Sequence, residues 1–438
     1  MNATEDITAR DLAALPVTTP KPSLYRYPLF KVLRSFSCGR LRMDLPEGKC
    51  EVFGCQADGP QAQITVRNEA FFRRCALYSG IGLGESWMDG EWDTPDLRTV
   101  IEWFILNLHA DARLAGNSSR LKRVGFLQVV NRIGHLLRPN SKRISRRNIA
   151  EHYDLGNDFY RLWLDPTMTY SRARYTRPDQ SLEEAQSSKY QSLCEKLHLR
   201  TDDHVLEIGC GWGGFSLHAA RHFGCRVTAV TISEAQYQEA SRRVRDAGLE
   251  DRIEIRLQDY RDIEGQFDKV ASIEMLEAVG DRFLETWTKK CHELLKPHGL
   301  LGVQMITVPD CDHDDLKRGT DYIQKHIFPG SLLLAVGRMN QAMNRTGNLF
   351  LHALEDLGAS YARTLREWHR AFNDKGEEIR ALGYPERFIR KWNFYLKYCE
   401  AAFATHNISV VQAVYTRPCN LALHREDGVI VPNHPRRP

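Results

Sequence analysis

The sequence has few of the features that mark membrane-spanning or disulfide-stabilised proteins. Its 438 residues contain no run of about 18 apolar residues, the length that a bilayer-spanning helix requires. Residues 1–16 mix acids with short apolar pieces and lack the basic segment and apolar core of a secretory signal. The 11 cysteines are scattered and form no CxxC pair, which argues against a disulfide framework or a metal site and favours a reducing cytoplasm.

The sequence also lacks a strong excess of charge of one sign. Its 60 Lys and Arg residues face 56 Asp and Glu residues, so bulk charge does not indicate a nucleic-acid-binding protein. Between Asp111 and Glu151, however, basic residues are frequent and no acidic residue occurs. Apolar residues recur there every three or four positions over 120–137, which predicts a basic amphipathic helix. Such a helix either binds an anionic phospholipid membrane or packs against a domain with its charged face in water; too few aromatic residues accompany the basic ones for a nucleic-acid groove.

Shifts in composition divide the chain into five segments. They are a flexible tail at 1–23, a small α+β domain at 24–110, the basic amphipathic connector at 111–147, a larger domain at 148–420 and a second flexible tail at 421–438. In the small domain, alternating apolar runs predict strands and a helical spacing follows them, at 40–45, 50–53, 63–66 and 99–108. The sequence leaves the assembly state open, with a homodimer among the alternatives.

The larger domain alternates predicted strands with predicted helices. The strands are expected at 205–208, 226–231, 252–257, 267–273 and 299–308. Helices are expected at 213–223 and 233–247, the second with Ser233 as its N-cap. This order predicts an α/β domain with a parallel, doubly wound sheet that binds its ligands beyond the carboxyl ends of the strands.

A glycine-rich loop follows the first of these strands. Gly209, Gly211 and Gly214 have the spacing of dinucleotide-binding loops, but the second strand ends without the acid that would hold a ribose. The acid, Glu207, precedes the loop instead, where it suits a ligand with an ammonium group, such as the amino acid part of S-adenosylmethionine. Gln258 and Asp259 follow the third strand and could accept hydrogen bonds from an adenine amino group. We therefore expect an S-adenosylmethionine site rather than a nicotinamide site.

With these motifs the sequence resembles the cyclopropane fatty acid synthase family of S-adenosylmethionine-dependent methyltransferases, which includes the mycolic acid cyclopropane synthases. The resemblance spans about 148–417, and its motifs lie at 151–157, 164–171, 205–214, 230–236, 258–261, 277–280, 327–330, 361–368 and 395–403. It implies a Rossmann-like class I methyltransferase fold. It also implies which residues surround the cofactor: Tyr170, Ser171, Gly209, Gly211, Gly213, Thr231, Gln236, Gln258 and Asp259.

Methyl transfer from a sulfonium to an unactivated alkene places positive charge on carbon, so the site must exclude water and tolerate a cation. Aromatic faces meet both needs. The candidates are Tyr153, Tyr170, Tyr361, Trp368 and Tyr395. Each of them is more often a core-packing residue, except that Tyr361 stands at the family's position for a catalytic tyrosine.

By the same resemblance, relatives hold a bicarbonate ion as the base that closes the ring. Their glutamate, backbone amide and tyrosine correspond to Glu277, Ile306 and Tyr361. Their cysteine is Arg172 here and their histidine is Gln304. Arg172 could hold bicarbonate as a guanidinium clamp or could face solvent, so bicarbonate and ring closure remain open.

Cys399 coincides with a cysteine that has been considered catalytic in relatives. It stays among the candidate catalytic residues, although the chemistry requires no thiolate and a packing role is favoured. The expected function is transfer of methyl from S-adenosylmethionine to the double bond of phospholipid acyl chains, forming cyclopropane fatty acids. The alternatives are methylation without ring closure and a non-catalytic lipid-binding protein. The expected location is cytoplasmic, at the inner face of the membrane.

Overall fold

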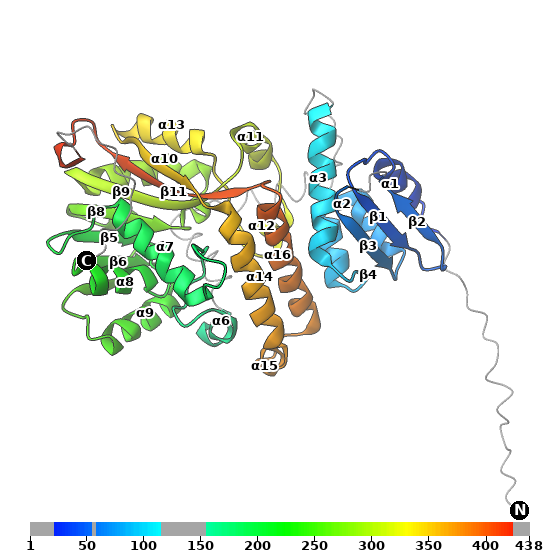
Figure 1. The fold of residues 1–438 in the computed structure, drawn as a ribbon, viewed down its shortest axis with the longest axis horizontal. Helices are drawn as coiled ribbons and strands as arrows, with labels where there is room; N and C mark the ends of the chain where they lie inside the picture. The colour runs from blue at the N-terminus through cyan, green and yellow to red at the C-terminus, as the bar shows by residue number, and fades with distance from the viewer. Residues whose placement is uncertain (1–21, 55–57, 115–154, 424–438) are drawn as a thin grey trace, which may run out of the picture.

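The computed structural model describes residues 22–54, 58–114 and 155–423 (Figure 1). The predicted tails therefore lie almost wholly outside the described residues. The same holds for the amphipathic helix expected at 120–137 and for Tyr153, one of the candidate aromatic residues. No described helix is both long enough and apolar enough to cross a bilayer.

The small N-terminal domain contains a four-stranded sheet, as an α+β domain predicts. Its order is β2-β1-β3-β4, and β1 pairs parallel to β3. The strands are β1 (Arg40–Asp44), β2 (Cys50–Phe53), β3 (Gln61–Val66) and β4 (Trp92–Asp93). The helices are α1 (Arg26–Leu33), α2 (Ala70–Met88) and α3 (Leu97–Leu114). Alternate residues of β3 are buried, so the expected alternation of apolar residues forms one face of a core.

The larger domain is built on a seven-stranded sheet of order β10-β11-β9-β8-β5-β6-β7. The strands are β5 (His204–Ile208), β6 (Arg226–Thr231), β7 (Ile253–Leu257), β8 (Phe267–Ile273), β9 (Leu295–Thr307), β10 (Phe350–Asp356) and β11 (Ser409–Thr416). All five predicted strands are present. Ser233 caps its helix through a hydrogen bond from the Gln236 backbone N–H to its side chain.

Helices cover both faces of this sheet, and Figure 1 shows their arrangement. They are α7 (Leu182–Lys196), α8 (Gly214–Phe223), α9 (Glu234–Asp246), α10 (Asp281–Leu294) and α13 (Val336–Thr346). Further helices lie beyond the strand ends: α6 (Asn157–Trp163), α11 (Asp310–Arg318), α12 (Tyr322–His326), α14 (Gly358–Asp374), α15 (Gly376–Ala381) and α16 (Glu386–Ala404). The predicted doubly wound α/β fold is confirmed.

The sheet differs from a wholly parallel one at β11, which pairs antiparallel with both β9 and β10. The cause lies in the connection between β10 and β11. Helix α14 begins directly after β10, and α16 packs against α14 and brings the chain back. Ser409 consequently begins β11 next to Asp356 at the end of β10, with its hydroxyl donating to the Asp356 carboxylate at 2.7 Å. A strand that starts where its neighbour ends must run in the opposite direction.

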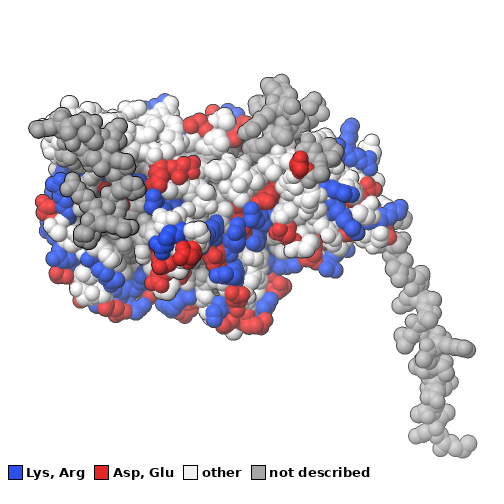
Figure 2. Space-filling model, in the orientation of Figure 1, with Lys and Arg blue, Asp and Glu red and all other residues white. Residues whose placement is uncertain are grey.

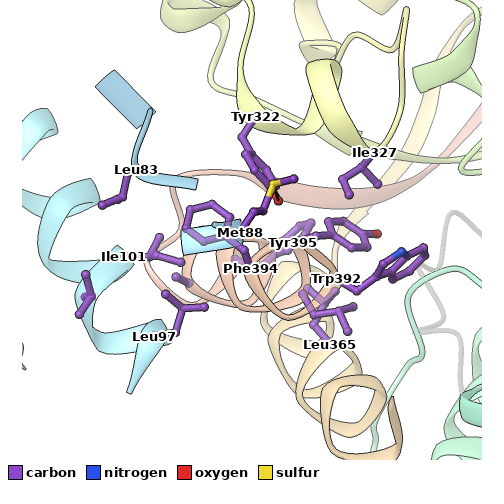
Figure 3. Packing of buried hydrophobic residues seen from close by; sticks show 14 of the residues in the cluster. Leu83, Met88, Leu97, Ile101, Tyr322, Ile327, Leu365, Trp392, Phe394 and Tyr395 are labelled. Atoms are coloured by element: carbon purple, nitrogen blue, oxygen red, sulfur yellow. Dashed lines mark hydrogen bonds between the residues drawn. The ribbon is translucent and has the colours of Figure 1, made fainter. Parts of the chain in front are cut away.

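The two domains share a hydrophobic core (Figure 3). Leu83 and Met88 of α2 lie with Ile101 of α3 against Tyr322 and Phe394 of the larger domain. The edge of this interface is polar, since Trp87 Nε1 donates to the carbonyl of Arg390 at 3.0 Å. Burial of this many apolar side chains fixes the small domain against α16, so that α3 can contribute to a cavity in the larger domain.

Candidate active site

A cavity of about 1190 Å³ opens at the carboxyl ends of the parallel strands. Residues following β5, β6, β7, β8 and β9 line it, as the doubly wound fold predicts. The N-terminal domain contributes Ile105, Leu106 and Leu108 of α3 to the same lining. The cavity therefore has a polar end formed by strand termini and an apolar wall to which both domains contribute.

The glycine loop forms one end of this cavity. Gly209, Gly211 and Gly213 have φ angles of +83°, +53° and +83°, a region that side chains disfavour. The backbone N–H groups of Gly209 and Cys210 both donate to Val230 of β6 at 3.0 Å, which ties the loop to the neighbouring strand. A Cβ atom on Gly211 would meet no protein atom within 4 Å, so it would occupy cavity space. The loop thus provides a cradle of bare backbone.

Glu207 lies beneath the loop at the end of β5. It is buried, lines the cavity and accepts a hydrogen bond from the hydroxyl of Ser216 in α8. Burial raises the pKa of Glu207 to about 7, against the hydrogen bond from Ser216, which lowers it. A buried carboxyl group of this kind can bind a cation, because a nearby ammonium group would stabilise the ionised form that burial disfavours.

Asp259 lies just beyond the end of β7, which is two strands away from β5 in the sheet. Both of its carboxylate oxygens accept from Arg261, at 2.8 Å from Nε and 2.6 Å from Nη2. The neighbouring Gln258 is oriented by a 2.8 Å hydrogen bond from its amide nitrogen to the carbonyl of Asp262. Asp259 also accepts from the backbone N–H of Arg261 at 3.0 Å, and it lines the cavity.

The remaining predicted cofactor residues gather around the same end. The hydroxyl of Thr231 donates to Gln236 Oε1 at 2.9 Å, and both side chains line the cavity. Ser171 accepts a 2.7 Å hydrogen bond from the buried Lys189. Tyr170 bonds to the hydroxyl of Tyr395 at 2.9 Å across the cavity wall. The structure therefore brings every predicted cofactor-binding residue except Gly213 into the lining of one cavity, and Gly213 completes the turn before α8.

Aromatic rings enclose the other end. Tyr361, Tyr395, Phe328 and Phe403 line it, with Tyr361 and Phe403 at 4.3 Å between ring centroids. Trp368 does not: it is fully buried behind this wall, 5.3 Å from Tyr170 and 6.1 Å from Tyr361. Of the predicted aromatic residues, Trp368 is thus a packing residue and Tyr170, Tyr361 and Tyr395 face the cavity.

Two carboxyl groups lie at this aromatic end, and the sequence analysis singled out one of them. Glu277 accepts from the backbone N–H of Ile306 at 2.6 Å, as expected for that pair. Burial, reinforced by the charge of Glu274, raises the pKa of Glu277 to about 8. Tyr361, however, donates to Glu274 at 2.7 Å and not to Glu277. Glu274 is the functional candidate that sequence reasoning missed, although it stands three residues before Glu277 in the same motif.

Arg172 and Gln304 both donate a hydrogen bond to Glu274, Arg172 from its backbone and Gln304 from its side chain. Arg172 is fully buried, so the solvent-facing alternative is wrong. Its side chain lies outside the cavity lining of the described residues and donates to the carbonyl of Ala173, while its backbone N–H donates to Glu274 at 3.0 Å. Gln304 donates its amide to the same carboxylate at 2.6 Å. The position of the Arg172 guanidinium gives no support to an anion clamp inside the cavity.

Cys399 lines the cavity, but burial raises the pKa of its thiol. A neutral thiol supports the packing role that the sequence analysis favoured. His326 is a satisfied polar side chain, with its ring nitrogen 2.9 Å from Glu85 of the N-terminal domain. Within the described residues no group of three or more His, Cys, Asp or Glu side chains could hold a metal ion.

Comparison with known proteins gives consistent matches over the larger domain. A family model described as mycolic acid cyclopropane synthetase matches residues 140–413. The chain is 36% identical over 364 residues to tuberculostearic acid methyltransferase of Mycobacterium tuberculosis, covering 79% of this chain and 81% of that protein. It is 35% identical over 356 residues to cyclopropane-fatty-acyl-phospholipid synthase of Escherichia coli, covering 81% and 88%.

Solved structures agree with these matches. A mycolic acid cyclopropane synthase complexed with S-adenosylhomocysteine and CTAB is 27% identical, with a TM-score of 0.58 over 62% of this chain and 98% of that one. A cyclopropane synthase from Mycobacterium tuberculosis gives the same TM-score at 28% identity. The sheet order, the glycine loop and these matches lead to one conclusion: the chain belongs to the mycolic acid cyclopropane synthetase family, a family of fatty acid and lipid methyltransferases, and is an S-adenosylmethionine-dependent methyltransferase.

Proposed function

We propose that the enzyme transfers the methyl group of S-adenosylmethionine to the double bond of unsaturated acyl chains carried on membrane phospholipids and closes a cyclopropane ring. One observation carries this proposal. A single cavity joins the glycine loop to an aromatic end and an apolar wall, through lining residues such as Gly211, Tyr361 and Leu106. A cofactor and an acyl chain could therefore meet inside one cavity.

At the polar end of the cavity, each lining residue would have a role in binding the cofactor. Glu207 would accept from its ammonium group, the bare backbone at Gly211 would allow close approach, and Gln258 with Asp259 would accept from its adenine amino group. Thr231, Gln236, Tyr170 and Ser171 would complete the enclosure. When bound, S-adenosylmethionine supplies an electrophilic methyl group on a positively charged sulfur.

The aromatic end suits the alkene. Attack of the alkene on a methyl group leaves positive charge on the acyl chain, and the faces of Tyr361, Tyr395 and Phe403 can stabilise that charge. These rings also exclude water, which would otherwise capture the cation as an alcohol. Ile105, Leu106 and Leu108 of α3 offer the apolar surface that a long acyl chain requires.

A bicarbonate ion does not fit the reacting end as the resemblance implies. The hydroxyl of Tyr361 already donates to Glu274, and the Ile306 N–H already donates to Glu277. The position of the expected histidine holds Gln304, whose amide is also engaged by Glu274. The donors expected to bind an anion are therefore occupied by the protein's own carboxyl groups.

Methylation without ring closure is the second candidate. Gln304 is the observation that favours it, because a glutamine replaces the basic residue that the resemblance leads one to expect beside the reacting carbon. The similarity to a tuberculostearic acid methyltransferase points the same way. This candidate shares the cofactor, the acyl substrate and the first step of the leading one and differs in the product.

The products of one reaction distinguish these outcomes. Vesicles of monounsaturated phospholipid would be incubated with the enzyme and methyl-labelled S-adenosylmethionine, with saturated phospholipid vesicles as the control. Label in a product that resists mild hydrogenation and shows cyclopropane protons by NMR would support ring formation. A vinylidene product of the same mass would favour the open-chain candidate. Labelling of neither lipid would contradict the proposed function.

Contact with the membrane surface is proposed for the basic connector at 111–147, of which residues 115–147 lie outside the described residues. On the face in Figure 2, Lys and Arg residues are interspersed with Asp and Glu, so the described surface in that view offers no single-sign patch. Replacing Arg120, Lys122, Arg123 and Arg132 by Glu should weaken sedimentation with anionic vesicles and remove its salt dependence. Unchanged binding at low salt would favour the alternative of a packing helix.

A further inference from the structure

Glu274 occupies a position where the backbone favours glycine. It follows the last residue of β8, and its φ of +48° lies in the left-handed region, which residues with a side chain disfavour. Its backbone N–H donates to the carbonyl of Gln304 at 2.8 Å, which holds that conformation in place. Strain of this kind persists where the surrounding structure stabilises it, and it is concentrated at functional sites.

The side chain of Glu274 is held by three donors. Its Oε1 accepts from the backbone N–H of Arg172 at 3.0 Å and from Gln304 Nε2 at 2.6 Å. Its Oε2 accepts from the hydroxyl of Tyr361 at 2.7 Å. Glu274 and Tyr361 line the cavity, whereas Arg172 and Gln304 lie behind it. The carboxylate is thus fixed from behind while its Oε2 retains a lone pair at the cavity surface.

A chain of hydrogen bonds through the sheet determines the orientation of Gln304. The ammonium of Lys196 can only donate, and it donates to Gln412 Oε1 at 2.6 Å. Gln412 must then present its amide N–H to Gln304 Oε1, at 3.0 Å. Gln304 in turn must present its own N–H to Glu274. Each hydrogen bond in this chain therefore has one possible direction. The chain ends with an amide N–H of Gln304 that donates to Oε1 of Glu274.

Buried positive charges balance this carboxylate. Arg172 and Lys189 are both fully buried, and burial lowers the pKa of each, to about 10 for Arg172 and about 7 for Lys189; the charge of Glu274 opposes this lowering. Burial keeps the neighbouring Glu277 protonated, with its pKa near 8 and its Oε2 without a hydrogen-bond partner in the described structure.

We infer that Glu274 is the base of the reaction, a carboxylate built into the chain where a bound bicarbonate ion would otherwise act; this inference rests on the proposed function. In this step a C–H bond of the transferred methyl group breaks. Its electron pair forms the second C–C bond of the ring and neutralises the cation on the acyl chain. The proton passes to Oε2 of Glu274, which Tyr361 holds in place.

The test compares Glu274→Gly, Glu274→Gln and the parent enzyme in buffer freed of carbon dioxide, with monounsaturated phospholipid vesicles. The parent should form product at the same rate with and without added bicarbonate. Both variants should lose about 10² to 10⁴ in rate, the usual contribution of a general base. Glycine suits the φ of +48° and leaves the donors of Tyr361 and Gln304 free, so Glu274→Gly should fold and bind cofactor normally.

Chemical rescue separates a base from a structural residue. Formate or bicarbonate should restore part of the activity of Glu274→Gly, and neither should restore Glu274→Gln, in which the amide fills the space. Glu277→Gln should lose less activity than Glu274→Gln, because an amide resembles a protonated carboxyl group. The matched control is Glu91→Gln, a buried carboxyl in the N-terminal domain outside the cavity lining, which should keep the parent rate.

Several results would overturn the inference. They are a parent that requires bicarbonate, a Glu274→Gly enzyme as fast as the parent without added anion, and a Glu277→Gln enzyme slower than Glu274→Gln. In each of these cases the parent still methylates the lipid, so the proposed function stands. A parent that transfers no methyl group to unsaturated phospholipid overturns both.

Discussion

The two ends of the cavity are built in different ways. The cofactor end consists of short motifs, each placed at a strand terminus by the segment that carries it, such as Glu207 to Gly213 after β5. The reacting end brings together Arg172, Glu274, Gln304 and Tyr361, which come from four separate parts of the chain. A site of the first kind is visible in the sequence, and a site of the second kind depends on how distant segments pack.

The largest expected effect belongs to the cofactor end. Gly211→Val would force a β-branched side chain into a left-handed conformation and into the cavity, so affinity for S-adenosylmethionine should fall by at least about 10²-fold. Gly248→Val is the matched control, because Gly248 also has a positive φ and open surroundings but is exposed at the end of α9. Calorimetric titration of both variants checks this, and an undiminished affinity in Gly211→Val would contradict the assignment of the loop.

The reacting end should respond to the loss of a single hydroxyl. Tyr361→Phe removes a hydrogen bond to a carboxylate, worth about 1.5–3 kcal/mol, so product formation should slow about ten- to hundredfold while cofactor affinity holds. Tyr322→Phe removes a buried hydroxyl that bonds to Lys391 and lies outside the cavity lining. It should lower thermal stability and leave the rate unchanged. Equal rates in the two variants would show that Tyr361 only packs.

A pH titration tests the cofactor end more finely. Glu207 must be ionised to bind an ammonium group, and its pKa near 7 means that binding below this pH must displace a proton. Affinity for S-adenosylmethionine should therefore rise with pH, by up to about tenfold per unit below 7, and reach a maximum between about 7 and 8, above which the amino group of the cofactor loses its proton. Glu207→Gln should bind more weakly and without this slope. If the affinity of the parent enzyme does not change between about pH 5.5 and 7, Glu207 does not bind the ammonium group of the cofactor.

The smallest effect is expected at Cys399. Its thiol is neutral in this cavity, because burial raises its pKa, and the proposed chemistry uses no thiolate. Cys399→Ser should therefore keep the parent rate within about threefold. Initial rates of lipid methylation at saturating cofactor measure this. A loss as large as that of Tyr361→Phe would return Cys399 to the catalytic residues.

Local sequence patterns were sufficient for most of the fold. The run that became β6 and the capping serine of α9 were predicted at their observed positions, because a short apolar run and a helix cap depend on a few neighbouring residues. The antiparallel β11 was not predicted. Its direction depends on α14 and α16 returning the chain to the end of β10, which no local pattern encodes.

The sequence by itself determined the family, the alternation of five strands with helices and the motifs of the proposed cofactor end, because those features are carried by contiguous segments of the chain. Only the tertiary structure decided the reacting end. The side chain of Arg172 turns into the core, Glu274 takes the hydrogen bond of Tyr361, and Gln304 is oriented by a chain of donors that begins at Lys196. Hydrogen-bond direction and burial are properties of packed groups, and neither exists until the distant segments meet.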